Sequence, residues 1–173
     1  MIRPTVFAAA FGLLTAASAW AGPQYIDDTG FAVSGYDVVS YFALGQAAKS
    51  DDQPAPALGR ADITLEHNGA VFAFATEANR DAFAAEPARF VPQYDGHCAY
   101  GVAGGYKVPA NPTLWRIVDD KLFLNINRRV ARKWERDISG YEQTAMDKWP
   151  DLEPRPASTD DVPQFSATGP LVN

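Results

Sequence analysis

The sequence has very little sulfur and very little imidazole. Its 173 residues include one cysteine, Cys98, two histidines and two methionines. A single cysteine cannot form a disulfide within the chain, so the fold has to be held together by packing. A structural zinc site of the Cys₄ or Cys₂His₂ kind is also excluded within one chain, because it needs more thiol and imidazole groups than are present.

Basic charge is also scarce. Fifteen Lys and Arg residues face 21 Asp and Glu residues, which gives a formal net charge of -6. An acidic chain is poorly suited to nucleic acid, so no nucleic-acid partner is expected. The only basic cluster spans residues 128–136, where Arg128, Arg132 and Arg136 share one helix face. We interpret this cluster as a solvated surface.

A long apolar run occurs only near the amino end. Arg3 precedes an apolar run over residues 6–19, and Ala19-Trp20-Ala21 has the A-x-A form of a signal-peptidase site. The run is too short for a comfortable transmembrane span. We therefore predict that residues 1–21 are a signal peptide cleaved after Ala21. The mature chain would then lie in the periplasm or be secreted, with no stable membrane anchor.

Hydrophobic periodicity is lost from Pro150 onward. Residues 151–156 and 160–163 mix prolines with acidic and small residues, which is typical of an extended or disordered chain. Three parts are therefore predicted. They are the signal peptide (1–21), one folded domain (22–149), and a Pro-rich, acidic, disordered tail (150–173).

Two hairpins are the clearest local predictions. Residues 63–67 and 71–74 alternate in polarity around Asn68-Gly69, a pair that favours a type I′ turn because both positions need positive φ. A second hairpin is predicted over residues 114–125, with its turn at Asp119-Asp120. Short helices are predicted at 35–42, 79–85, 127–138 and 141–149, and a surface loop at 47–59. The predicted fold class is α+β, a small single domain with two β-hairpins and several short helices.

The lone cysteine lies in the segment Gln93-Tyr94-Asp95-Gly96-His97-Cys98. Three roles are open to it: a soft metal ligand, a redox-active thiol, or a small buried side chain. Reactivity requires the thiolate, which the start of a short helix at Cys98 would favour. Neighbours in an extended chain point to opposite faces, so Cys98 pairs more easily with the distant His67 than with His97. His67 ends a strand beside a turn, where an exposed side chain is expected.

Two longer motifs resemble a known family. The pattern Phe72-x-Phe74-Ala75-Thr76-x-x-Asn79-x-x-x-Phe83, followed by Pro87 and Phe90, resembles the YHS domain, which is related to the TRASH metal-binding modules. Residues 35–42 and 92–101 are similar to the flanks of exported, single-domain YHS proteins. The resemblance spans about residues 35–149 and implies a metal-linked module. The positions that hold cysteines in such domains are occupied here by Ala75 or Thr76 and Asn79, and the early Asp-Pro-Val-Cys element is replaced by Asp37-Val38-Val39-Ser40.

The resemblance therefore centres the predicted function on Cys98. Some exported members are described as selenoproteins, which suggests a reactive chalcogen at this position. We expect an extracytoplasmic module that binds a soft metal ion, with copper as the leading candidate, through Cys98 with His97 or His67. The alternatives are a thiol-redox protein that uses Cys98 and a non-catalytic structural or partner-binding domain. No nucleophile elbow, HExxH, P-loop or dinucleotide motif occurs, so no catalytic residue is assigned and the chain is not expected to be an enzyme.

Overall fold

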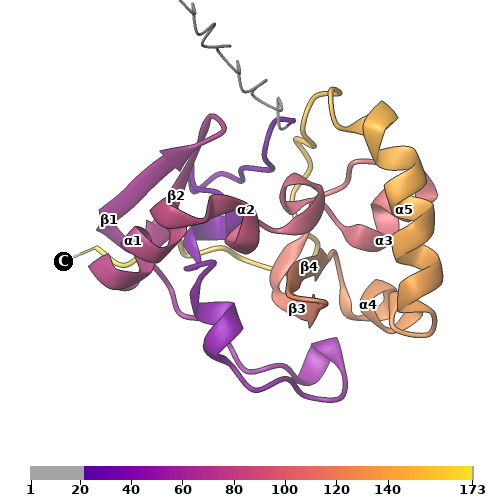
Figure 1. Cartoon of the computed structure of the whole chain (residues 1–173), viewed down its shortest axis with the longest axis horizontal. Helices are drawn as coiled ribbons and strands as arrows, with labels where there is room; N and C mark the ends of the chain where they lie inside the picture. The colour runs from indigo at the N-terminus through magenta and orange to yellow at the C-terminus, as the bar shows by residue number, and fades with distance from the viewer. Residues whose placement is uncertain (1–21, 173) are drawn as a thin grey trace, which may run out of the picture.

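The computed structural model describes residues 22–172, so the predicted signal peptide lies outside the described residues. The elements form two groups, each built around one antiparallel hairpin (Figure 1). The first group contains β1 (Arg60–His67), β2 (Ala70–Phe74), α1 (Glu77–Ala85) and α2 (Pro87–Phe90). The second contains α3 (Ala99–Gly104), β3 (Asn111–Val118), β4 (Lys121–Asn125), α4 (Arg128–Trp134) and α5 (Ile138–Leu152). The predicted α+β fold with two hairpins is confirmed.

Both hairpins turn through two residues in the left-handed region. The φ angles are 50° and 74° at Asn68 and Gly69, and 47° and 56° at Asp119 and Asp120. Positive φ at both central residues is the type I′ geometry predicted for Asn68-Gly69. β1 and β3 begin at residues 60 and 111 rather than at the predicted 63 and 114, because each strand continues past an irregularity in its pairing.

Short 3-10 turns replace the helix that was predicted over residues 35–42. They are η1 (Val33–Gly35) and η2 (Ser40–Ala43); η3 (Ser50–Asp52) lies in the predicted loop and η4 (Gln93–Gly96) precedes the cysteine. The side chain of Asp37 explains the difference. Its Oδ1 accepts hydrogen bonds from the amides of Val39 and Ser40, and such local side-chain bonds compete with a continuous helix.

The carboxyl-terminal helices are divided at a different point from the one predicted. The side chain of Thr76 caps α1 and that of Asn127 caps α4, as their sequence positions indicate. However, α4 ends at Trp134, and Asp137 caps α5 by accepting a hydrogen bond from Gly140 N at 3.0 Å. α5 therefore begins at Ile138, three residues before the predicted start at residue 141, because the Asp137 carboxylate at the N-cap stabilises a helix that begins directly after it. α5 then continues past residue 149 to residue 152.

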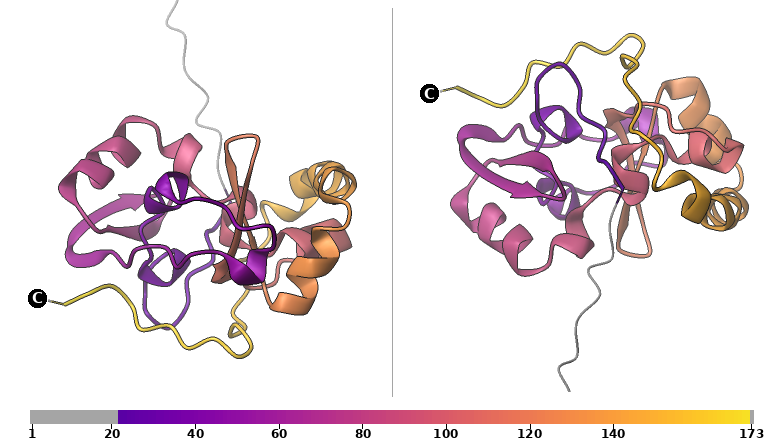
Figure 2. Two further views of the ribbon diagram at one scale, coloured as in Figure 1. Left: turned by 90° about the horizontal axis from the view of Figure 1, so that it is seen from below. Right: turned by 90° about the horizontal axis from the view of Figure 1, so that it is seen from above.

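The tail after α5 is extended and contacts the domain. It runs from the end of α5 back across the molecule toward β1 (Figures 1 and 2). Ser158 N donates to His97 Nε2 at 3.1 Å, and Leu171 N donates to the Gly59 carbonyl at 2.7 Å. The tail predicted to be extended or disordered thus lacks regular secondary structure but is hydrogen-bonded near both ends. The folded unit reaches beyond the predicted boundary at residue 149.

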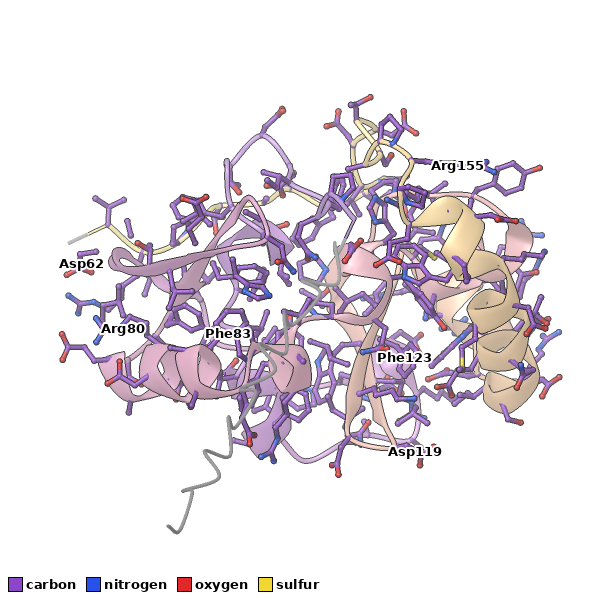
Figure 3. All side chains as sticks on the ribbon, turned by 45° about the horizontal axis from the view of Figure 1, so that its top comes forward. Asp62, Arg80, Phe83, Asp119, Phe123 and Arg155 are labelled. Carbon is purple, nitrogen blue, oxygen red and sulfur yellow. The ribbon has the colours of Figure 1, made fainter. Side chains whose placement is uncertain are left out.

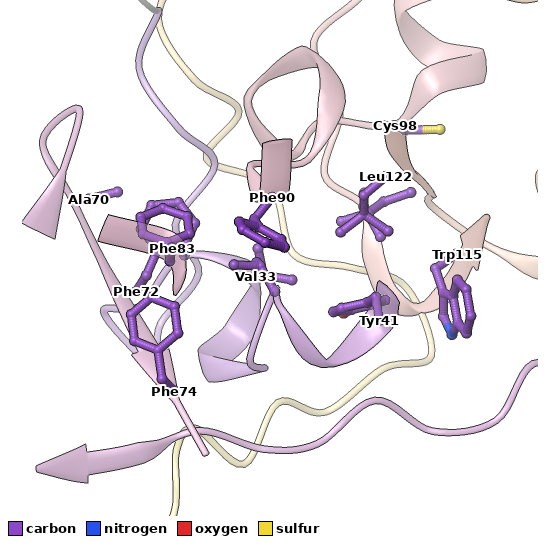
Figure 4. Close-up of a cluster of buried hydrophobic side chains, with 14 residues drawn as sticks. Val33, Tyr41, Ala70, Phe72, Phe74, Phe83, Phe90, Cys98, Trp115 and Leu122 are labelled. Carbon is purple, nitrogen blue, oxygen red and sulfur yellow. The ribbon is translucent and has the colours of Figure 1, made fainter. Parts of the chain in front are cut away.

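Two clusters of buried apolar side chains support the two hairpins. The larger one contains Phe72, Phe74 and Phe83 from the first group and Trp115 and Leu122 from the second, all 0% exposed (Figure 4). The Phe83 ring centroid lies 4.9 Å from that of Phe72 and 5.2 Å from that of Phe74. The smaller cluster surrounds Phe123 and Trp134 between β4 and the helices α3 to α5, and Figure 3 labels Phe123 within the molecule. The larger cluster therefore joins the two groups.

A fully buried carboxylate, Asp37, ties the amino-terminal segment to the corner between β2 and α1. Its Oδ1 accepts from the amides of Val39 at 2.9 Å and Ser40 at 3.3 Å. Its Oδ2 accepts from the amide of Ala75 at 2.8 Å and from Asn79 Nδ2 at 2.6 Å. Ser40, Ala75 and Asn79 thus all donate hydrogen bonds to the Asp37 carboxylate. These are positions at which the domains that the sequence resembles hold cysteines.

Substitution of Asp37 should destabilise the whole fold. The change Asp37→Ala leaves several buried donors without an acceptor, and we expect a loss of about 3 kcal/mol in the free energy of unfolding. Urea unfolding at pH 7 measures it. The matched control is Asp81→Asn, an exposed acid paired only with its neighbour Arg80, which should change stability by less than about 0.5 kcal/mol. Equal losses in the two variants would contradict the role of Asp37.

Candidate functional site

The segment before Cys98 has an unusual backbone. Tyr94, Asp95 and Gly96 follow one another with φ angles of 60°, 54° and 76°. Left-handed backbone costs a non-glycine residue about 1–2 kcal/mol, so a consecutive pair needs support from its surroundings. Part of that support comes from the amino-terminal segment, where Tyr25 N donates to the Asp95 carbonyl at 2.8 Å. This turn brings His97 and Cys98 into the interior.

Cys98 is the N-cap residue of α3, which begins at Ala99, and its sulfur is not accessible. The side chain is 0% exposed and belongs to the larger apolar cluster (Figure 4). Sγ donates a hydrogen bond to Asn125 Oδ1 at 3.5 Å. Burial raises the pKa of the thiol, and the backbone amides of Gly101, Ile126 and Tyr100 oppose only part of that shift. The structure therefore favours a neutral thiol rather than a reactive thiolate.

His97 is buried and both of its ring nitrogens have partners. Nδ1 lies 2.9 Å from the Tyr94 carbonyl and therefore carries the proton, while Nε2 accepts from Ser158 N at 3.1 Å. Burial lowers the pKa of His97 to about 4, although the bond to the Tyr94 carbonyl acts in the opposite direction. The single lone pair that a metal would need is used by the backbone of the tail. His97 thus holds the tail against the domain.

His67 is partly buried rather than exposed as expected. Its ring packs edge-on against Phe83, with the centroids 5.6 Å apart, and burial lowers its pKa. It lines a small cavity of about 240 Å³ together with Tyr94 and Asp95, whereas Cys98 does not line that cavity. The structure therefore does not bring the three predicted site residues together around one opening.

The donor atoms do not fit a soft metal ion in this arrangement. A Cu(I) site needs an available thiolate and one or two further ligands. Cys98 offers a buried thiol bonded to Asn125, and His97 offers no free lone pair. Within residues 22–172, no group of three or more His, Cys, Asp or Glu side chains is arranged to hold a metal ion. Copper binding remains a prediction from the resemblance.

Asp95 is an unusual residue that the sequence reasoning did not single out. It is 7% exposed, and its Oδ1 accepts from Gln24 Nε2 at 2.8 Å. Its Oδ2 is buried and has no hydrogen-bond partner within the described residues. Burial raises the pKa of Asp95 to about 6, while the nearby Lys107 ammonium acts in the opposite direction. The Asp-Gly pair predicts a turn, but only the tertiary structure shows that the carboxylate is buried.

A recess on the surface lies between the amino-terminal loop and the tail, and we call it the tail groove. Its volume is about 760 Å³, within the range of roughly 300–1,000 Å³ that is usual for ligand sites. Figure 2 shows the loop and the tail passing along each other at the surface. The lining residues are Tyr25, Asp27, Asp28, Thr29, Phe31, Ala61, residues 161–170 and Val172.

The tail groove is acidic and partly apolar. Asp27, Asp28 and Asp161 line it, and no Lys or Arg occurs among its described lining residues. Burial and, to a smaller extent, the negative charges of nearby carboxylates together raise the pKa of Tyr25 to about 12. These carboxylates belong to Asp27, Asp161, Asp28 and Asp160. Phe31 and Phe165 add apolar surface. A recess with this lining favours a positively charged ligand that also has an apolar part.

The segments around the tail groove are well anchored. Tyr25 Oη donates to the Asp160 carbonyl at 3.0 Å, and Val162 is 7% exposed. At the other end, Ala61 N donates to the Leu171 carbonyl at 2.8 Å. The Asp27 carboxylate accepts from the hydroxyls of Thr29 and Ser34, which fixes its position. A groove with anchored walls loses little conformational entropy when a ligand binds.

Comparisons with protein families, with curated proteins and with solved structures find no match for this chain. Among the helices within residues 22–172, none combines the length and the apolar character needed to cross a bilayer.

The burial of Cys98 predicts a protected thiol. In the native protein, we expect the thiol to react with a water-soluble disulfide reagent at least about 100-fold more slowly than in the unfolded protein, because the sulfur is enclosed and neutral. Absorbance of the released thiolate measures the rate.

The copper content of the purified protein should be equal in the wild type and in Cys98→Ala. Rapid native labelling, or copper that is lost in Cys98→Ala, would instead support the prediction of a reactive or metal-binding thiol.

The lowered pKa of His97 predicts a specific pH dependence of stability. Because the folded state binds the proton less tightly than the unfolded state, the stabilisation is complete above about pH 6.5 and is lost as the pH falls toward 4. We expect the stability advantage of the wild type over His97→Gln to shrink by on the order of 3 kcal/mol between pH 7.5 and 4. Urea unfolding across this range measures it.

The comparison between these two proteins also removes the opposite contribution of Asp95. The raised pKa of that carboxyl makes acidification stabilising, but both proteins contain Asp95 and the contribution cancels. A stability difference that does not change with pH would mean that folding does not lower the pKa of His97.

Proposed function

We propose that this chain is a non-catalytic binding domain, of the exported YHS type that its motifs resemble, and that the tail groove binds a basic peptide segment of a partner protein. The observation that supports this function is the combination of three carboxylates, apolar surface and no basic lining residue in a recess of about 760 Å³. The two thiol-based functions lack a comparable recess, since the Cys98 sulfur is enclosed.

Charge complementarity specifies the ligand. A lysine or arginine side chain can place its charged end near Asp28 and Asp161, and its methylene groups can lie against Phe31 or Phe165. Both walls are extended backbone, the amino-terminal loop on one side and the tail on the other, which suits an extended peptide rather than a helix. The net charge of -6 would also favour encounter with a basic partner.

Copper binding and thiol redox chemistry at Cys98 remain predictions from the resemblance. Both require the sulfur to become exposed, for example by movement of α3 away from β4. The metal and thiol measurements described for Cys98 test them directly, and they are independent of the tail groove because no residue of that groove contacts the sulfur through a hydrogen bond in the described structure.

A peptide-binding experiment tests the proposed function. The probe is a nine-residue peptide that alternates lysine with leucine, and calorimetry at 50 mM salt measures its Kd. We expect Asp28→Asn combined with Asp161→Asn to weaken binding by about tenfold, because two of the three carboxylates are neutralised. The matched control is Asp119→Asn combined with Asp120→Asn in the exposed turn between β3 and β4, where asparagine tolerates the left-handed backbone.

The control pair should leave the Kd unchanged, and the wild-type Kd should weaken as salt is raised. A peptide that alternates glutamate with leucine should not bind. Equal affinity for both peptides, or equal losses in the two double variants, would overturn the proposed function.

A further inference from the structure

Gly22 occupies a place where no other residue fits. It is buried against the backbone that follows α5, and Figure 1 shows the start of the described chain beside this turn. A Cβ atom at Gly22 would lie 2.1 Å from the Glu153 carbonyl oxygen and 2.7 Å from Asp95 Oδ2. Both distances are shorter than any real contact of a Cβ atom. The Asp95 oxygen is therefore within about 4 Å of the Gly22 Cα, to which the residue's nitrogen is bonded.

The carboxylate that faces Gly22 lacks a partner. Asp95 Oδ2 is buried and accepts no hydrogen bond within the described residues, while Oδ1 is bonded to Gln24. Tyr25 N also donates to the Asp95 carbonyl, so residues 22–25 lie along Asp95. A buried carboxylate oxygen without a donor is destabilising, because it has lost its contact with water and gained no hydrogen bond. A nearby donor of positive charge would remove that cost.

The surrounding groups also favour a cation. The Glu153 carbonyl lies at the C-terminal end of α5, where the helix dipole is negative, and the Glu153 carboxylate adds negative charge near Asp95. The Lys107 ammonium group also faces this region, where its Nζ donates to the carbonyls of Glu153 and Arg155, both at 2.9 Å. Lys107 does not hydrogen-bond to Asp95 Oδ2, so the carboxylate remains open to a second cation.

We propose that removal of the predicted signal peptide creates this cation, and that the new α-ammonium group of Gly22 binds Asp95 Oδ2 and the Glu153 carbonyl. A signal endopeptidase hydrolyses the Ala21–Gly22 amide with one water molecule, which leaves a carboxylate on Ala21 and an ammonium group on Gly22. The site couples maturation to stability, because the Gly22 nitrogen is a neutral amide before cleavage and becomes a positively charged ammonium group only afterwards. The inference rests on the predicted cleavage after Ala21 and is independent of the tail groove.

The first part of the test compares chain starts. Mass spectrometry of the exported protein should show that it begins at Gly22. A form that retains Ala21 before Gly22 should unfold about 4 °C lower than the mature form. In the Asp95→Asn background this difference should be much smaller, because the carboxylate that binds the ammonium group is absent. In the matched control Asp28→Asn, an exposed acid in the same amino-terminal region, the difference should stay at its wild-type value.

The second part measures the amine itself. We expect the Gly22 α-amine to undergo reductive methylation at least tenfold more slowly in the native mature protein than after unfolding in urea, and Asp95→Asn should lose most of that protection. The comparison of native with unfolded wild type remains valid even if Asp95→Asn does not fold. Three outcomes would overturn the inference. They are a mature chain that starts elsewhere or keeps its leader, an unprotected amine, or a lowering of the unfolding temperature by Ala21 that is equal in the wild type and in Asp95→Asn. Affinity for the lysine–leucine peptide should be unaffected by Asp95→Asn, which separates this inference from the proposed function.

Discussion

The buried carboxylate of Asp37 is the interaction on which the arrangement of the larger core depends. It accepts two hydrogen bonds from its own segment and two from the corner between β2 and α1. A fully desolvated carboxylate is tolerated only when its oxygens are satisfied. Satisfying them forces the amino-terminal segment, the end of β2 and the start of α1 into one position. The apolar cluster around Phe83 then packs on a frame that is already determined.

The turn at Tyr94 and Asp95 has a comparable effect on the two ends of the described chain. The amino-terminal segment bonds to Asp95 through Gln24 and Tyr25, and the tail bonds to His97 through Ser158. A backbone with two consecutive left-handed non-glycine residues is strained, and these contacts hold it in place. The segment that drew attention because of its cysteine is therefore a structural junction, and the anchored ends that it holds form the walls of the tail groove.

The contrast between the sulfur and the tail groove follows from burial. Cys98, enclosed by apolar neighbours, has a raised pKa and a bond to Asn125, and both effects disfavour the charged form that ligation and nucleophilic attack require. The carboxylates of the tail groove lie at the surface, where charge is well solvated and still acts on an approaching ligand. Chemistry that requires a thiolate is therefore opposed by this conformation, whereas recognition of positive charge is not.

Local rules were sufficient for several elements. The Asn68-Gly69 turn, the Thr76 cap with Phe83 on the buried face of α1, and the Asn127 cap of α4 each depend on residues that are close in the sequence. The misplaced boundaries had local causes as well: the side chain of Asp37 replaced a helix with two short turns, and Asp137 moved the start of α5. Asp37 and Asp137 are visible in the sequence, but only the folded chain shows that their side-chain hydrogen bonds prevail over the predicted helix boundaries.

The candidate site was less accessible to sequence reasoning. The sequence by itself determined that one thiol and two imidazoles exist, that no internal disulfide can form and that the chain is acidic. It also determined both hairpin turns, because positive φ is a property of particular residue pairs. Tertiary structure alone decided that Cys98 is enclosed, that His97 serves the tail, and that Asp95 faces Gly22. These outcomes depend on desolvation and on contacts between residues more than sixty positions apart. A local sequence pattern predicts neither the desolvation of a side chain nor such distant contacts.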